Sequence, residues 1–125
     1  MEENVIAKNI LNHSFDIHKA LGPGLLESVY QSCLKYRLEK AGFIVKYECP
    51  MPVIFEEVRM ECGYRADLIV NEKVIVEVKS VSALIEVHTA QLLTYLKLSG
   101  CKLGLLLNFN EAQLKNGIKR MVNGL

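Results

Sequence analysis

Apolar side chains recur at helical spacing along the first part of the chain. They fall at Ile6, Ile10, Ile17 and Leu21, and then at Leu26, Val29, Tyr30, Cys33, Leu34, Leu38 and Ala41. Positions three or four apart lie on one face of a helix. The segment Leu21-Gly22-Pro23-Gly24 ends the first helix, and Gly42 is placed to end the second. The pattern therefore predicts two amphipathic helices, over about residues 5–21 and 25–41.

The period changes after Gly42, where runs rich in branched residues predict strands. One strand begins at Phe43-Ile44-Val45 and is interrupted by Pro50 and Pro52, and another begins at Val53-Ile54-Phe55. Two further strands, over about 59–70 and 74–78, flank the turn-like Asn71-Glu72-Lys73.

The last third of the chain returns to helical spacing and then to a buried strand. A helix is predicted over residues 84–98, with Ile85, Leu92 and Leu96 on one side. A leucine-rich strand over 102–109 and a short closing helix from residue 111 follow. The order of two helices, four strands, helix, strand and helix predicts a three-layer α/β or α+β sandwich around one mixed sheet.

Composition fits one packed domain over residues 1–125. Half of the residues are hydrophobic and 23% are charged, which favours a folded core over disorder. No apolar run approaches the roughly 20 residues that a membrane span needs. The acidic start Met1-Glu2-Glu3-Asn4 leads into the helical pattern without a secretory signal, so we expect a cytoplasmic protein with no membrane contact.

Charge and cysteine content narrow the choice of metals and partners. The four cysteines include no C-x-x-C pair, which argues against a zinc site and a disulfide framework. The net charge of +1 lacks the basic excess common in nucleic-acid binders. Contacts with phosphate would therefore depend on local groups such as Lys115, Lys119 and Arg120.

The hairpin around Asn71–Lys73 carries the candidate chemistry. On a strand from Val74, alternation puts Val76 and Val78 on one face and Glu77 and Lys79 on the other. A three-residue loop sets Val70 opposite Val74, and the same register sets Asp67 opposite Glu77. Two opposed carboxylates destabilise a sheet unless positive charge lies between them.

A divalent cation such as Mg²⁺ or Mn²⁺ would supply that charge, with the Val78 carbonyl as a further oxygen ligand. Lys79 would stabilise charge on a phosphate, and together these groups outline metal-assisted hydrolysis. The same residues also fit an exposed hairpin in which Arg65 and Lys79 pair with the two acids. A two-residue loop would place Asp67 on the opposite face.

Several sequence motifs resemble those of a known family. Asp67 followed by Glu77-Val78-Lys79 resembles the PD-(D/E)XK nuclease superfamily, although Ala66 stands where its name has proline. Gln91-Leu92-Leu93-Thr94-Tyr95 resembles the superfamily's Q-x-x-x-Y motif. Gly24-Leu25-Leu26-Glu27-Ser28-Val29-Tyr30 matches the signature of its GxxExxY family, which Tyr64–Leu68 and Leu107–Phe109 also resemble. The likeness spans about residues 21–123.

The resemblance implies a restriction-endonuclease-like αβββαβ core and a set of site residues. Asp67, Glu77 and the Val78 carbonyl would bind the metal, and Glu27 would approach it directly or through water. Lys79 would stabilise charge. Gln91 would contact the site or a phosphate and Tyr95 would support it, while Tyr30 would pack rather than react. His88, near Gln91, could face the substrate, but a lone histidine is more often structural, which is the role expected here.

Two functions fit these features. The first is a Mg²⁺- or Mn²⁺-dependent nuclease that hydrolyses phosphodiester bonds in DNA. The second is a non-catalytic nucleic-acid-binding or assembly subunit that keeps the nuclease fold, which the small size and near-neutral charge favour. A core this small offers little surface to hold a duplex, which leaves room for a homodimer.

Overall fold

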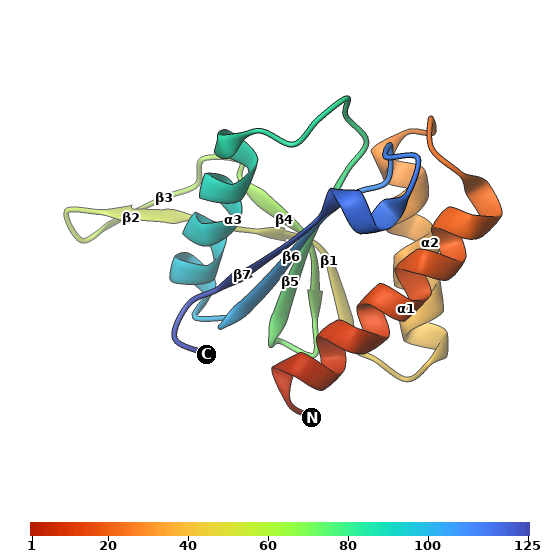
Figure 1. Ribbon diagram of the computed structural model, residues 1–125. Helices are drawn as coiled ribbons and strands as arrows, with labels where there is room; N and C mark the ends of the chain where they lie inside the picture. Colours follow the sequence, from red (N-terminus) through yellow and green to blue (C-terminus); the bar gives the residue numbers. More distant parts are fainter.

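The computed structural model describes residues 1–125 and has three layers (Figure 1). A mixed five-stranded sheet, in the order β1-β4-β5-β6-β7, has α1 and α2 on one face and α3 on the other. The helices are α1 (Glu3–Leu21), α2 (Glu27–Lys40) and α3 (Glu86–Ser99). The strands are β1 (Val45–Pro50), β2 (Val53–Phe55), β3 (Val58–Met60), β4 (Arg65–Val70), β5 (Val74–Lys79), β6 (Leu103–Asn108) and β7 (Ile118–Val122), with a 3₁₀ turn, η1, at Leu114–Gly117. The three-layer prediction is confirmed.

The β5 strand lies at the centre of the sheet. It pairs antiparallel with β4 and parallel with β6, the connection to β6 running through α3. Helices cover both faces, so the strand is buried on both sides, as expected for a near-continuous apolar run. Its one acidic residue, Glu77, is therefore held inside the protein.

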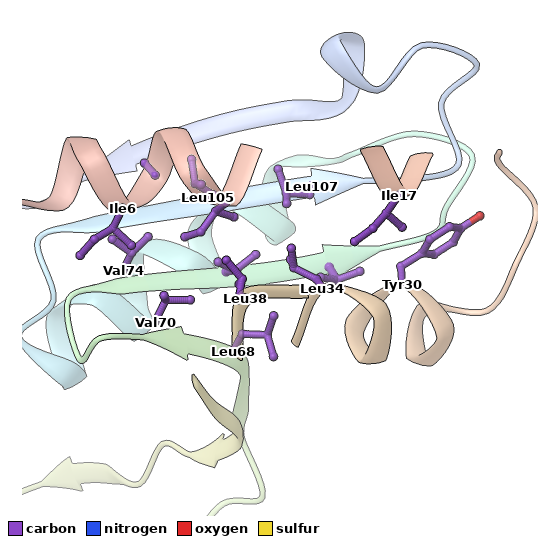
Figure 2. Close-up of a cluster of buried hydrophobic side chains, with 14 of the residues drawn as sticks. Ile6, Ile17, Tyr30, Leu34, Leu38, Leu68, Val70, Val74, Leu105 and Leu107 are labelled. Carbon is purple, nitrogen blue, oxygen red and sulfur yellow. The ribbon is translucent and has the colours of Figure 1, made fainter. Parts of the chain in front are cut away.

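Two apolar clusters fill the space between the layers. Val74, Val76 and Val78 pack with the leucines of α2 and β6 on the α1–α2 side (Figure 2). Ile75 packs with Leu92 and other residues of α3 on the opposite side. The predicted all-valine face of β5 is confirmed, and it leaves Glu77 and Lys79 on the α3 side.

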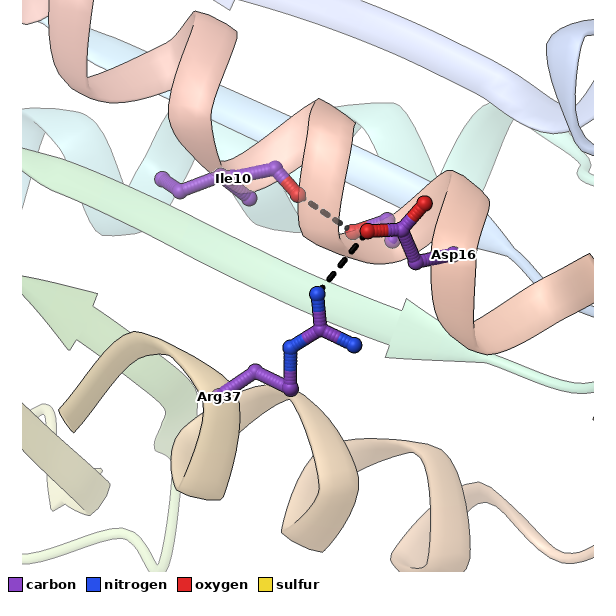
Figure 3. Close-up of polar contacts among 4 residues, drawn as sticks. Ile10, Asp16 and Arg37 are labelled. Carbon is purple, nitrogen blue, oxygen red and sulfur yellow. Dashed lines mark hydrogen bonds and ion pairs between the residues drawn. The ribbon is translucent and has the colours of Figure 1, made fainter. Parts of the chain in front are cut away.

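A polar contact joins α2 to α1. Arg37 Nη2 donates to Asp16 Oδ2 at 2.8 Å (Figure 3). Both side chains are exposed, so the pair contributes at most about 1 kcal/mol. The Ser14 hydroxyl donates to the Ile10 carbonyl at 2.7 Å, which keeps this buried hydroxyl satisfied within α1. Burial of the apolar stripes therefore supplies most of the helix–helix stability.

The predicted strand over 59–70 is wrong as one element. It is split at Gly63, whose φ of +77° bends the chain between β3 and β4. The β2 and β3 strands instead form a separate two-stranded hairpin that projects past α3 (Figure 1). Five strands thus precede α3 rather than four.

The predicted closing helix is also wrong. After η1 the chain forms β7, antiparallel to β6. A Cβ on Gly117 would lie 2.6 Å from the Asn108 carbonyl oxygen, so only glycine permits the close approach that returns the tail to the sheet. The new strand pairs the backbone groups that β6 would otherwise leave open.

Several apolar residues assigned to buried helix faces are exposed. Leu26 and Ile85 are 75% and 58% exposed because each is the extended residue that precedes its helix. Leu21 and Val29 also face solvent near a helix end. Cys33 packs against the core as predicted. None of the helices has the length and apolar content to cross a membrane.

Candidate active site

The β4–β5 hairpin has the predicted register. Residues 71–73 form the turn, Val70 pairs with Val74, and Leu68 pairs with Val76. Asp67 therefore lies across from Glu77. The regular pairing of the two strands ends at Leu68 and Val76, one residue before the two acids.

The two carboxylates replace the missing backbone pairing. The main-chain N–H of Asp67 donates to Glu77 Oε2 at 2.7 Å. The main-chain N–H of Val78 donates to Asp67 Oδ2 at 2.7 Å. Each acid thus accepts a hydrogen bond from the opposite strand, which offsets part of the cost of placing two carboxylates together.

Asp67 also lacks a regular partner on its other side. Tyr47 and Cys49 of β1 pair with Leu68 and Ala66, which puts Glu48 opposite Asp67. Glu48 has a φ of +49°, and no backbone pair forms there. The backbone of Asp67 therefore has no regular strand partner on either side. The acidic side chains lie at this break in the pairing.

Burial makes this carboxylate pair hard to ionise. Desolvation, and then the charge of Asp67, raise the pKa of Glu77 from 4.5 to about 8. Desolvation likewise raises the pKa of Asp67, against the hydrogen bond from Val78 and the charge of Lys79. The pair therefore retains a proton at neutral pH, a property of the two groups together.

Lys79 lies at the end of β5 on the same face as Glu77. Its charge lowers the pKa of both acids. It belongs to none of the five ion pairs in the structure. Its ammonium therefore stays available to a ligand.

The first turn of α2 brings Glu27 to the end of β5. Glu27 Oε2 accepts from the Ser80 main-chain N–H at 3.2 Å, and the Ser80 hydroxyl donates to the Leu25 carbonyl at 2.7 Å. The charge of Glu27 raises the pKa of both Asp67 and Glu77, so the three acids share one neighbourhood. As the side chains lie, however, no three acidic, histidine or cysteine residues are grouped to enclose a metal ion.

Gln31 is a site residue that sequence reasoning missed. It is only 6% exposed, and its Oε1 accepts from the Tyr47 hydroxyl at 3.2 Å. Its amide N–H groups are left to face Asp67, where hydrogen bonding lowers the pKa of that acid. The sequence holds one signal for this residue: Gln31 lies one helical turn after Glu27, on the same face of the helix.

Gln91 and Tyr95 approach from α3. With Asp67, Glu77 and Lys79 they line a pocket of about 310 Å³. Tyr95 is buried, and desolvation and then the charges of Glu77 and Asp67 raise its pKa to about 12. The structure thus brings five of the predicted site side chains to one pocket. Glu27 approaches the carboxylates from the α2 side but does not line the pocket.

A family model described as the PD-(D/E)XK nuclease superfamily matches residues 4–121. The chain belongs to the PD-(D/E)XK nuclease superfamily. The match runs from α1 into β7 and includes every residue of the pocket described above. No curated protein and no solved structure matches the chain significantly.

In this nuclease-superfamily chain, other motif residues hold loops around the site. The Tyr30 hydroxyl donates to the Gly22 carbonyl at 2.6 Å, and its ring stacks on Phe109 at 4.6 Å. Asn108 accepts from the Val81 N–H and donates to the Val81 carbonyl, which fixes the chain after Lys79. Tyr30 thus packs as expected, and it shapes the turn before Glu27.

Two other groups of residues lie away from the predicted chemistry. His88 Nδ1 accepts from the Ile85 N–H at 3.1 Å and caps α3, which is the structural role expected of it. Lys119 and Arg120 are neighbours on a strand and point to opposite faces. Arg120 donates to Asn4 Oδ1 at 2.6 Å. Lys119 and Arg120 therefore do not combine into one basic cluster.

Proposed function

We propose that this chain is a divalent-metal-dependent nuclease that hydrolyses phosphodiester bonds in DNA, and that it belongs to the GxxExxY family within its superfamily. One observation carries the proposal. Asp67 and Glu77 face each other on neighbouring strands and line one pocket, with the unpaired ammonium of Lys79 beside them. A structural role alone does not account for a buried and a half-buried acid that face each other and share a proton.

The donor set fits Mg²⁺ or Mn²⁺. The pKa of Glu77 is raised by desolvation and by the charge of Asp67, and the charge of Lys79 only partly offsets this; a divalent cation would supply further positive charge. Asp67 and Glu77 would hold it, with Glu27 nearby or acting through water. The N–H and C=O of a strand residue point the same way, so the Val78 carbonyl faces the Asp67 side as its N–H does. Oxygen ligands of this kind suit hard divalent ions.

When bound, the ion would stabilise negative charge on the phosphate and lower the pKa of water at the site. The chain's own residues orient the substrate and balance charge. Lys79 stabilises the charge that develops on the phosphate. Gln91 can donate to a phosphate oxygen or accept from water. Tyr95 braces the pocket wall with its buried ring.

A second function has one observation in its favour. Both carboxylates already accept backbone hydrogen bonds, and no third acid closes a metal cage around them. This arrangement also fits a non-catalytic nucleic-acid-binding or assembly subunit with the same fold.

A cleavage panel separates the two functions. Purified protein would be incubated with Mg²⁺ or Mn²⁺ and with single-stranded DNA, duplex DNA and RNA, beside Glu77→Gln and an EDTA control. We expect metal-dependent cleavage of DNA by the wild type and none by Glu77→Gln. Binding of nucleic acid without cleavage of any substrate would favour the non-catalytic subunit.

A further inference from the structure

An apolar pocket adjoins the candidate active site. It has a volume of about 260 Å³ and lies between Val53, at the base of the β2–β3 hairpin, and Val87 and Leu98 of α3. Tyr64, Gln91 and Tyr95 line both this pocket and the one that holds the carboxylates. The two pockets therefore adjoin, and a ligand bound at Asp67 and Glu77 lies beside the apolar pocket.

The walls of the apolar pocket select an uncharged, flat group. None of its lining residues is charged, so it offers a phosphate nothing to neutralise its charge. Tyr64 is 48% exposed, and its ring makes an edge-to-face contact with Tyr95, at 6.4 Å between centroids and 65° between planes. An edge-to-face contact covers at most one face of the Tyr64 ring, so this half-exposed side chain has a face on which a ligand can stack.

Two polar side chains complete the lining. Gln91 makes no side-chain hydrogen bond in the structure, so its amide can both donate and accept. The Thr94 hydroxyl donates to the Ala90 carbonyl at 3.0 Å, which leaves its oxygen to accept. A planar ring with donors and acceptors on its edge matches this set, and nucleobases have that form.

We propose that the apolar pocket holds an unpaired nucleobase beside the phosphate that is cleaved, and that the substrate is single-stranded nucleic acid or an unpaired stretch. The proposal rests on the proposed nuclease function and specifies its substrate. The base and phosphate of one nucleotide are covalently joined, so a phosphate at the carboxylates carries its base to the adjoining pocket. A base stacked and paired in a duplex cannot enter such a pocket.

The test measures binding in Ca²⁺, with an end-labelled octanucleotide that carries 2-aminopurine at successive positions. Stacking quenches 2-aminopurine fluorescence, so we expect quenching at one position in the single strand and none in the matching duplex. Tyr64→Ala should abolish that quenching and weaken binding roughly tenfold or more, whereas Tyr64→Phe should keep both. Tyr36→Ala, which removes an exposed tyrosine from α2, should behave as wild type.

The outcomes separate this proposal from the nuclease function. Equal binding of duplex and single strand, or no effect of Tyr64→Ala, would overturn the base pocket. Metal-dependent cleavage in the panel would still support the nuclease function in that case. Position-specific quenching without cleavage would support the pocket and overturn the nuclease. Dimerisation that Tyr64→Ala abolishes, with quenching absent, would make the pocket a contact between copies and would also overturn the proposal.

Discussion

Glu77 Oε2 accepts a hydrogen bond from the main-chain N–H of Asp67 at 2.7 Å, so one acid of the site holds the backbone of the other. The reverse contact runs from the Val78 N–H to Asp67 Oδ2, also at 2.7 Å. Both bonds need only an acceptor oxygen, which an amide side chain also provides. Asparagine and glutamine replacements can therefore remove charge while the hairpin geometry stays.

The first prediction concerns stability against pH. The Glu77 pKa is about 8 in the folded protein and near 4.5 in its ordinary environment. Between these pH values the unfolded chain has lost a proton that the folded protein keeps. The free energy of unfolding should therefore fall as pH rises from about 4.5 to about 8.

Glu77→Gln should flatten this dependence and exceed wild-type stability near pH 8 by at least about 1 kcal/mol, since a tenfold change in an ionisation constant corresponds to about 1.4 kcal/mol. Chemical denaturation in metal-free buffer measures it. Parallel pH profiles for the variant and the wild type would show that Glu77 ionises normally in the folded protein.

The second prediction concerns Gln31. Gln31→Leu removes an amide donor that faces Asp67, so the Asp67 pKa should rise further. Tyr47→Phe removes the hydroxyl that donates to Gln31 Oε1, so the amide is held less firmly against Asp67. The Asp67 pKa should shift in the same direction but by less. Carboxyl NMR titration reports both values. An Asp67 titration that neither variant moves would leave Gln31 as a packing residue.

The hairpin could be predicted because its loop length and its side-chain alternation both constrain the register. A three-residue turn and an all-valine face agree on one arrangement, and the structure has it. Leu92 and Leu96 likewise placed α3 on the sheet. Local periodicity was enough wherever one face of an element had to be buried.

The rest depended on contacts between residues far apart in the chain. The return of the tail as β7 follows from the approach of Gly117 to Asn108, which no local pattern reveals. The bonds from backbone amides to Asp67 and Glu77 exist only because pairing stops at Leu68. Spacing placed Gln31 on the same face of α2 as Glu27, but its contact with Tyr47 depends on the packing of α2 against β1.

The third prediction separates chemistry from binding at Lys79. Lys79→Ala should lose about a hundredfold or more in single-turnover cleavage, since its charge acts most strongly on the transition state. Substrate affinity, measured in Ca²⁺ by gel shift, should change little. Metal affinity, measured by calorimetric titration, should also change little. Lys8→Ala, at an exposed position on α1, is the matched control. Equal losses in binding and cleavage would instead make Lys79 a simple phosphate contact.

The fourth prediction asks whether α3 takes part in the site. Gln91→Ala should slow cleavage by roughly ten- to a hundredfold, about 1.4–2.8 kcal/mol of transition-state stabilisation, with little change in Tm. The exposed Gln113→Ala serves as control. Tyr95→Phe should be milder, and Tyr95→Ala should lower Tm because the ring is buried. Wild-type cleavage by Gln91→Ala would remove Gln91 from the site.

The most direct test of the proposed metal site is a calorimetric Mn²⁺ titration at pH 7. We expect the wild type to bind Mn²⁺ and to release close to one proton. With a pKa of about 8, Glu77 is mostly protonated at pH 7, and the ion must displace that proton to bind the carboxylate. Buffers of different ionisation enthalpy measure that proton. Asp67→Asn and Glu77→Gln should each abolish binding while the thermal melts stay cooperative, and Glu2→Gln should bind normally. A wild type that takes up no Mn²⁺, even with nucleic acid present, would contradict the metal-dependent site.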